Sequence, residues 1–358
     1  MKEKILDQYD IEKSLYESFN EKVKVMLAEL LEAHAIDIHN ISGRVKERNS
    51  LEKKIDIKDG KYNSLSDITD ICGIRIITYL DSDVDIVAEK LKHEFEYDEE
   101  NSIDKRQLKA DQFGYKSLHY VLRLKPDRIA LTEFKKYNGL KLEVQVRSIL
   151  QHAWAEIEHD LGYKGEFSIP EVFKRNFNRI SALLETADIE FDRLKAQLSD
   201  YEISVSNSIK ENPNVVLIDQ ASIIAFNEQS DELSSLMKII ISLNDASIIE
   251  ANNYSRLLIR LQFLHIKSIG ELNDIIKSDF ENIRKFILEF IDRKGATKVI
   301  SNYTQNFALS MVAHYIAAKN IDFNQIIEYL VVGGIENALA PEIANDMVEC
   351  YKLTSITK

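Results

Sequence analysis

The sequence contains few of the residues and motifs that define the common classes of site. It has two cysteines in 358 residues, Cys72 and Cys350. Two cysteines without paired spacing form neither a disulfide framework nor a zinc site, so we expect both to be reduced thiols. H-E-x-x-H, G-x-x-x-x-G-K-[ST] and G-x-G-x-x-G are also absent. These absences argue against zinc-enzyme, P-loop and dinucleotide-binding classes.

Long apolar runs are missing as well. No stretch of about 18 apolar residues occurs, as a membrane-spanning helix would need. The polar start of the chain lacks the apolar centre of a signal peptide. We therefore expect a soluble, cytoplasmic protein without a membrane partner. The formal net charge of -13 disfavours nonspecific binding to DNA, so any polyanionic ligand has to meet a local basic patch.

One such patch lies at residues 43–61. Only four acidic residues occur there, against these basic ones: Arg44, Lys46, Arg48, Lys53, Lys54, Lys58 and Lys61. Asn49 and Ser50 supply an N-cap for a helix that should end near Lys58. The patch is either a solvated charged helix or a site for a polyanion.

Residues 140–147 have a strictly alternating pattern. Apolar Leu140, Leu142, Val144 and Val146 alternate with polar Lys141, Glu143, Gln145 and Arg147. This predicts a strand with one buried face and one polar face. From Ser148 the spacing becomes helical: His152, Glu156 and His159 form a polar stripe, and Trp154 belongs to the opposite, apolar side.

The order of elements predicts an α+β domain over residues 1–202. We expect helices at 10–34, 50–58, 81–95, 148–163 and 170–200, an extended piece at 36–45, and strands at 71–80, 118–124 and 140–147. Such an order implies a small mixed β-sheet flanked by helices.

The remainder of the chain predicts a second, all-α domain. Residues 203–228 are polar and resemble a linker. Helices are expected at 231–243, 247–264, 270–275, 277–293, 304–318, 322–331 and 341–351. Because residues 229–358 contain no cluster of catalytic residue types, we expect a regulatory or interaction domain.

The chemistry-bearing residues converge on one kind of ligand. Asp70 opens a strand, Glu143 lies within another, and His119 lies on the strand between them in sequence. Two carboxylates near the basic patch describe a site for a metal-bound polyphosphate, because phosphoryl transfer is catalysed mainly by positioning and charge neutralisation. Carboxylate ligands favour Mg²⁺.

Six ordered motifs carry a resemblance to a known family. They are Gly43-Arg44-Val45-Lys46, Ser50 with Lys54, Asp70-Ile71-Cys72-Gly73-Ile74-Arg75, Gly114-Tyr115-Lys116-Ser117-Leu118-His119, Glu143-Val144-Gln145-Val146-Arg147, and Trp154-Ala155-Glu156-Ile157-Glu158-His159 with Tyr163-Lys164. Residues 10–200 resemble the RelA/SpoT alarmone synthetase domain, which has a nucleotidyltransferase-like fold. Since only about 40 residues precede the first motif, we expect a short, synthetase-only form.

The resemblance implies an ATP-dependent pyrophosphokinase that transfers the β,γ-pyrophosphoryl group to the ribose 3′-hydroxyl of GDP or GTP, making (p)ppGpp. It implies these roles: Glu143, Asp70, Gln145 and His119 catalytic; Arg44, Lys46, Ser50, Lys54, Lys58 and Arg75 binding ATP; Tyr115, Lys116, Arg147 and His152 binding the acceptor; Asp70 and Glu143 holding Mg²⁺. If the strand began at Asp70, Asp70 and Arg75 would point to opposite faces.

Alternatives remain open from the sequence. The stretch Leu108–Phe113 departs from the family pattern beside the acceptor motif. The acceptor therefore stays open among GDP, GTP, an adenine nucleotide and tRNA. In toxin-type relatives it is the 3′ end of tRNA, and residues 203–358 would then restrain the activity. A third hypothesis is an inactive nucleotide sensor. A homo-oligomer or a protein partner is expected through the C-terminal domain.

Overall fold

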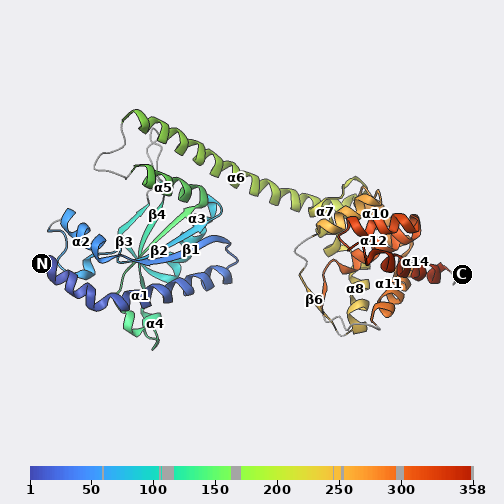
Figure 1. Cartoon of the computed structure of the whole chain (residues 1–358), viewed down its shortest axis with the longest axis horizontal. Helices are drawn as coiled ribbons and strands as arrows, with labels where there is room; N and C mark the ends of the chain where they lie inside the picture. The colour runs from blue at the N-terminus through green and yellow to red at the C-terminus, as the bar shows by residue number, and fades with distance from the viewer. Residues whose placement is uncertain are drawn as a thin grey trace. The chain divides into compact units, whose positions relative to one another are not determined.

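The computed structural model describes residues 1–58, 60–104, 106, 117–162, 171–244, 246–250, 254–295 and 302–355. The chain divides into two compact units, Met1–Ala196 and Gln197–Lys358, shown in Figure 1. Each unit has its own core of buried apolar side chains. Within the described residues, no helix is both long enough and apolar enough to cross a membrane.

The first unit is built on a five-stranded sheet. Its elements are α1 (Lys2–Ala33), β1 (Ile38–Val45), α2 (Arg48–Ile57), η1 (Leu65–Asp67), β2 (Cys72–Thr78), α3 (Asp81–Glu94), β3 (Phe95–Asp104), β4 (Leu118–Leu124), α4 (Pro126–Ile129), η2 (Lys135–Tyr137), β5 (Leu142–Ser148), α5 (Ile149–Gly162) and α6 (Glu171–Glu211). The strand order is β1-β2-β5-β4-β3. Among the described strands β2 and β5 pair in parallel and the other neighbours are antiparallel, so the sheet is mixed, as predicted.

The sheet has one apolar and one polar face because apolar and polar residues alternate along its strands. On β5, Leu142, Val144 and Val146 are fully buried, and they share a core with apolar side chains of α1 and α3. Helix α1 runs along the sheet (Figure 1). Its buried Asn20 donates hydrogen bonds to the carbonyl oxygens of Arg44 and Gly73. Since the apolar face of β5 is buried in this core, the opposite, polar face is available for a functional site.

Two local predictions in this unit were wrong. We predicted no strand between the helix that ends near residue 95 and the strand at 118–124, but β3 occupies Phe95–Asp104 as an edge strand. Its acidic residues hide the strand signal, as charged residues commonly do on sheet edges. The N-cap of α2 is Glu47 instead of Asn49 or Ser50.

The described residues of the second unit form helices and two short strands. It contains η3 (Pro213–Val215), α7 (Gln220–Gln229), α8 (Asp231–Asn244), β6 (Ser247–Ile249), α9 (Ser255–Phe263), α10 (Ile269–Ser278), α11 (Phe280–Gly295), β7 (Asn302–Thr304), α12 (Phe307–Asn320), α13 (Phe323–Val332) and α14 (Ala340–Ser355). Strands β6 and β7 pair in parallel. We predicted a helix at 247–264, but its first residues, Ser247–Ile249, form strand β6. The prediction failed there because a short apolar run is compatible with both a strand and a helix.

The linker predicted at 203–228 is largely helical. Helix α6 continues to Glu211, and α7 covers Gln220–Gln229. Val205 and Ile209 lie four residues apart and are buried in the core of the second unit, which explains why polar neighbours do not end the helix. Asp219 caps α7 through its side chain.

Candidate active site

An open pocket of about 160 Å³ lies on the polar face of the sheet. The register places Arg44 of β1 beside Gly73 of β2, and Gly73 beside Glu143 of β5. Because Gly73 has no side chain, the space above it, between Arg44 and Glu143, is open. A Cβ at Gly73 would meet nothing nearer than 3.8 Å, so the missing side chain leaves space for a ligand without being required by packing.

The next row of the sheet brings three more polar residues to the same face. Arg75 of β2 pairs with Gln145 of β5, which pairs with His119 of β4. Arg75 and Gln145 line the pocket together with Asp70. Asp70 precedes β2, which starts at Cys72. Strand alternation therefore does not apply to Asp70, and it shares the pocket with Arg75.

Asp70 is held by two lysines of the basic patch. Its Oδ1 lies 2.7 Å from the Nζ of Lys54, and its Oδ2 lies 3.1 Å from the Nζ of Lys46. All three side chains are at most 23% exposed. Such partly buried ion pairs are less screened by solvent than surface pairs. The structure thus places two cations and one anion at the edge of the pocket.

Side chains at alternate positions of β5 are linked to one another by hydrogen bonds, and the series ends at Glu143. Arg147 Nη2 donates to Gln145 Oε1 at 2.7 Å, and Gln145 Nε2 donates to Glu143 Oε1 at 3.0 Å. The Nδ1 of His119 lies 2.6 Å from the same Oε1. Burial alone would raise the pKa of Glu143, but these hydrogen bonds and the charge of Lys54 outweigh it and lower the pKa to about 2. The carboxylate is therefore ionised at neutral pH.

We expect acid to destabilise the wild-type protein more than Glu143→Gln. The folded pKa of Glu143 lies below its ordinary value, so the ionised group stabilises the fold above about pH 4.3 and loses this effect as pH falls toward 2. Between pH 5 and pH 3, urea titrations should show that the wild type loses about 1.5 kcal/mol more unfolding free energy than the variant. Equal losses would contradict the hydrogen-bonded arrangement of Glu143.

Helix α5 contributes polar groups at one end of this face. Glu156 Oε1 accepts a hydrogen bond from Arg75 Nη1 at 2.8 Å. Burial lowers the pKa of His152, and the charges of Arg147 and Arg75 lower it further, which favours the neutral imidazole. Trp154 is buried, as predicted. Glu156 of α5 therefore holds Arg75, one of the two arginines that line the pocket.

The matching family model covers residues 43–167 and is described as a region found in RelA / SpoT proteins. Residues 43–167 thus match a RelA/SpoT region. This confirms the resemblance drawn from the six motifs. The matched residues include the last three residues of β1 and all of β2, β4 and β5. They contain every residue that lines the pocket except Ser42.

Two Bacillus subtilis proteins are similar to this chain. GTP pyrophosphokinase YjbM is 29% identical over 178 residues, which is 48% of this chain and 79% of that protein. GTP pyrophosphokinase YwaC is 30% identical over 145 residues, or 37% of this chain and 62% of that protein. Among solved structures, small alarmone synthetase 1 of the same species is 26% identical and covers 54% of this chain and 99% of its own, with a TM-score of 0.46.

The structure brings most, but not all, of the predicted residues of the RelA/SpoT region together. Arg44, Asp70, Arg75, Glu143 and Gln145 line the pocket, while Lys46, Lys54, His119 and Arg147 contact these residues directly. Ser50 in α2 and Lys58 beyond it are exposed. Tyr115 and Lys116, predicted to bind the acceptor, lie outside the described residues, as do Tyr163 and Lys164.

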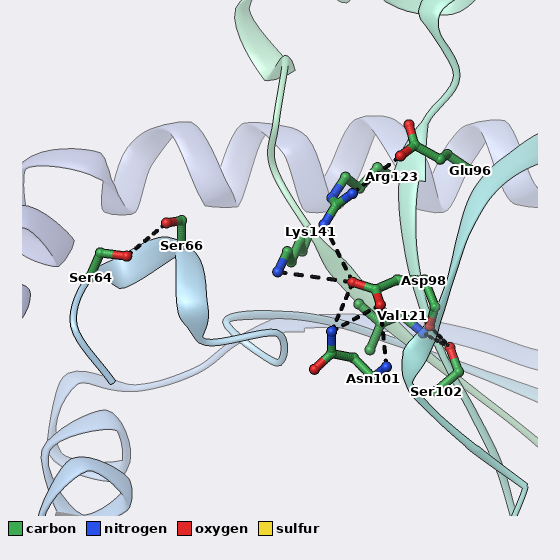
Figure 2. A network of polar contacts seen from close by, with 9 residues as sticks. All are labelled: Ser64, Ser66, Glu96, Asp98, Asn101, Ser102, Val121, Arg123 and Lys141. Carbon is green, nitrogen blue, oxygen red and sulfur yellow. Dashed lines mark hydrogen bonds and ion pairs between the residues drawn. The ribbon is translucent and has the colours of Figure 1, made fainter. Parts of the chain in front are cut away.

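A polar network on β3 and β4 was not predicted from the sequence. Figure 2 shows Asp98 of β3 between Arg123 of β4 and Asn101. Lys141 Nζ lies 4.0 Å from the same carboxylate. The pairing of β3 with β4 is irregular between Asp98 and Ile103, and Ser102 Oγ there accepts a hydrogen bond from Val121 N. An irregular edge strand has no periodic signal by which its partners could have been predicted.

The donor set of the RelA/SpoT region fits Mg²⁺. In the described part of the chain, no group of three or more histidine, cysteine, aspartate or glutamate side chains is arranged to hold a metal. Asp70 and Glu143 nevertheless line one pocket, and both hydrogen bonds to Glu143 fall on Oε1. One or two carboxylates completed by substrate phosphates and water are what Mg²⁺ ordinarily uses.

Proposed function

We propose that the first unit transfers the β,γ-pyrophosphoryl group of ATP to the ribose 3′-hydroxyl of GDP or GTP. In this reaction the 3′ oxygen bonds to the β-phosphorus, the bond from the β-phosphorus to the oxygen bridging it to the α-phosphorus breaks, AMP leaves, and the hydroxyl loses its proton. The observation that carries the proposal is the convergence of Arg44, Arg75, Asp70 and Glu143 on one pocket. The similarity to two proteins named GTP pyrophosphokinase supports the same reaction.

The basic residues would bind the donor. Arg44 and Arg75 face the pocket from adjacent strands, and guanidinium groups suit phosphate oxygens because they donate in a planar fork. Lys46 and Lys54 meet at the pocket edge, where an arriving triphosphate would compete with Asp70 for their charge. These four cations would fix the polyphosphate and neutralise its charge, which is the main source of catalysis in phosphoryl transfer.

The two carboxylates would act through their charge. With a pKa of about 2, Glu143 is a weak base at neutral pH, so we assign it to cation binding instead of proton abstraction. Together with Asp70 it would hold Mg²⁺, which when bound would neutralise charge on the reacting phosphates. Gln145 and His119 keep the Glu143 carboxylate oriented.

A transfer assay tests the proposal on the full-length protein. We expect that incubation with magnesium and γ-labelled ATP moves label to GDP or GTP, offered in parallel with adenine nucleotides and deacylated tRNA. Label on tRNA alone would instead favour the toxin-type acceptor. Nucleotide binding without any transfer would favour the inactive sensor and contradict the enzyme assignment.

A further inference from the structure

Two polar side chains interrupt the apolar face of helix α1. Asn20 is 3% exposed and Tyr9 is fully buried, as are their apolar neighbours Phe19 and Val23. Asn20 and Tyr9 are eleven residues apart, which is close to three full turns, so they share one face of the helix. An amide in an apolar core is unfavourable unless it is hydrogen-bonded. The partners of Asn20 therefore indicate what it does there.

Asn20 bonds to both strands of the β1–β2 pair. Its Nδ2 lies 3.0 Å from the carbonyl oxygen of Gly73 and 3.3 Å from that of Arg44, and these two residues are directly opposite each other. A third acceptor, the Sγ of Cys72, lies at 3.1 Å. Because all three neighbours are acceptors, the amide must direct its NH₂ group toward them. One side chain of α1 thus joins the two strands beneath the pocket.

Strand β1 leaves room for this amide at Gly43. Residue 43 alternates with Arg44 along the strand and so belongs to the apolar face. A Cβ at Gly43 would lie 2.1 Å from the Oδ1 of Asn20 and 3.0 Å from its Cγ, far closer than atoms approach in proteins. Glycine at position 43 is therefore what allows Asn20 to reach the two carbonyl oxygens.

Tyr9 makes a similar contact with the next residue of the site. Its Oη donates a hydrogen bond to the carbonyl oxygen of Lys46. Burial raises the pKa of Tyr9, so the phenol stays protonated and able to donate. Arg44 and Lys46 are thus both held through their backbone from α1, while their side chains belong to the pocket and its edge.

The position of β1 matters because this strand lies at the edge of the sheet. It has β2 as its one neighbouring strand in the described sheet. Arg44 lines the pocket with an exposed side chain, so the place of its guanidinium depends on where the backbone of β1 lies. A guanidinium binds phosphate through a planar fork whose orientation decides how many hydrogen bonds it makes.

We propose that Asn20 and Tyr9 are positioning residues, which hold β1 from its apolar side so that Arg44 and Lys46 meet the phosphates of the donor in the right geometry. The inference deepens the proposed function and rests on it. Neither α1 residue lines the pocket, so each acts through the backbone of β1. A displacement of about 1 Å in a binding group can slow an enzyme on the order of a hundredfold.

Titration calorimetry of the full-length protein with ATP, without magnesium, tests the positioning directly. Asn20→Leu keeps the size of the side chain but removes the donor, and Tyr9→Phe removes only the hydroxyl. The dissociation constant of ATP should rise at least about tenfold in the first and about fivefold in the second, since orienting hydrogen bonds contribute factors of this order.

Val23→Ala is the matched control for lost packing. Val23 is fully buried in the same core, so this variant should lower the melting temperature and leave the affinity for ATP unchanged. If Asn20→Leu and Tyr9→Phe both bound ATP like the wild type, or if Val23→Ala weakened binding equally, the proposal would be overturned.

Transfer kinetics separate positioning from folding. In both polar variants the KM for ATP should rise, while the KM for GDP stays within about twofold of the wild type, because the lost bonds affect the donor side. A residue that only supports the fold would lower the apparent kcat and leave the KM for ATP unchanged. A wild type that binds ATP without transfer would refute the proposed reaction and leave calorimetry to decide on Asn20. A wild type that binds no ATP would refute both.

A double substitution separates packing from hydrogen bonding. Gly43→Ala should lower the melting temperature, because its Cβ would collide with the Oδ1 of Asn20. Adding Asn20→Ala removes that amide and should restore most of the loss. Affinity for ATP should nevertheless stay weak, since the bonds to the carbonyl oxygens of Arg44 and Gly73 remain absent. If ATP affinity recovered together with the melting temperature, Asn20 would only fill space and its positioning role would be wrong.

Discussion

Glu143→Gln should lower kcat for pyrophosphoryl transfer by at least about a thousandfold while leaving the fold intact. The substitution keeps the size of the side chain but removes a negative charge that His119 and Gln145 hold in the pocket. Fixed charge at a phosphoryl-transfer site commonly contributes factors of this order. ATP binding without magnesium should be unchanged or tighter, because a triphosphate no longer meets this carboxylate. Steady-state kinetics and titration calorimetry measure the two effects.

Glu96→Gln provides the matched control for this substitution. Glu96 lies on the edge strand β3 and accepts a hydrogen bond from Arg123 at 3.2 Å, but it does not line the pocket. Its loss should leave kcat within about twofold of the wild type, since exposed ion pairs contribute little. If both variants retained activity, Glu143 would have no role in the reaction and the proposed site would be wrong.

The alternating strand and the six motifs were sufficient to predict the centre of this site. Strand β5 and its two faces could be predicted because Leu142, Val144 and Val146 alternate with polar residues without interruption. Glu143 and Gln145 then share a face by geometry alone. The position of Asp70 needed the structure, because nothing in the sequence distinguishes a strand that starts at Asp70 from one that starts at Cys72.

Other features depend on pairing between distant segments, which periodicity does not reveal. The open space at Gly73 lies between Arg44 and Glu143 because β1 and β5 pair with β2 on its two sides in this register. The edge strand β3 is polar and irregular, so only its ladder with β4 identifies it. The continuation of α6 past residue 202 was missed because polar residues outnumber Val205 and Ile209, which are the residues that anchor it. In each case burial supplied by another segment decides the local structure.

Asp70→Asn should lower transfer at least about a hundredfold at ordinary magnesium concentrations and shift the magnesium requirement upward. In the structure Asp70 neutralises Lys46 and Lys54, and in the proposed complex it would exchange these lysines for a cation while they turn to the triphosphate. Asparagine is a poorer ligand for Mg²⁺ because it is neutral. Without magnesium, the variant should bind ATP several-fold more tightly, because both lysines have lost their internal anion. Magnesium titrations of the rate and metal-free binding measure these opposite effects.

Asp70→Asn should slow transfer but tighten metal-free binding of ATP. These opposite effects distinguish an Asp70 that exchanges its lysine partners for a cation from an Asp70 that forms a purely structural ion pair. Asp10→Asn is the matched control, since Asp10 pairs with Arg48 of the same basic patch at 2.9 Å but lies outside the pocket; it should change neither quantity. A purely structural role for Asp70 would weaken metal-free ATP binding along with transfer, because the lysines would lose their positions. Tighter metal-free binding combined with slower transfer therefore follows only if Asp70 restrains the lysines before the donor arrives and contributes a metal ligand afterwards.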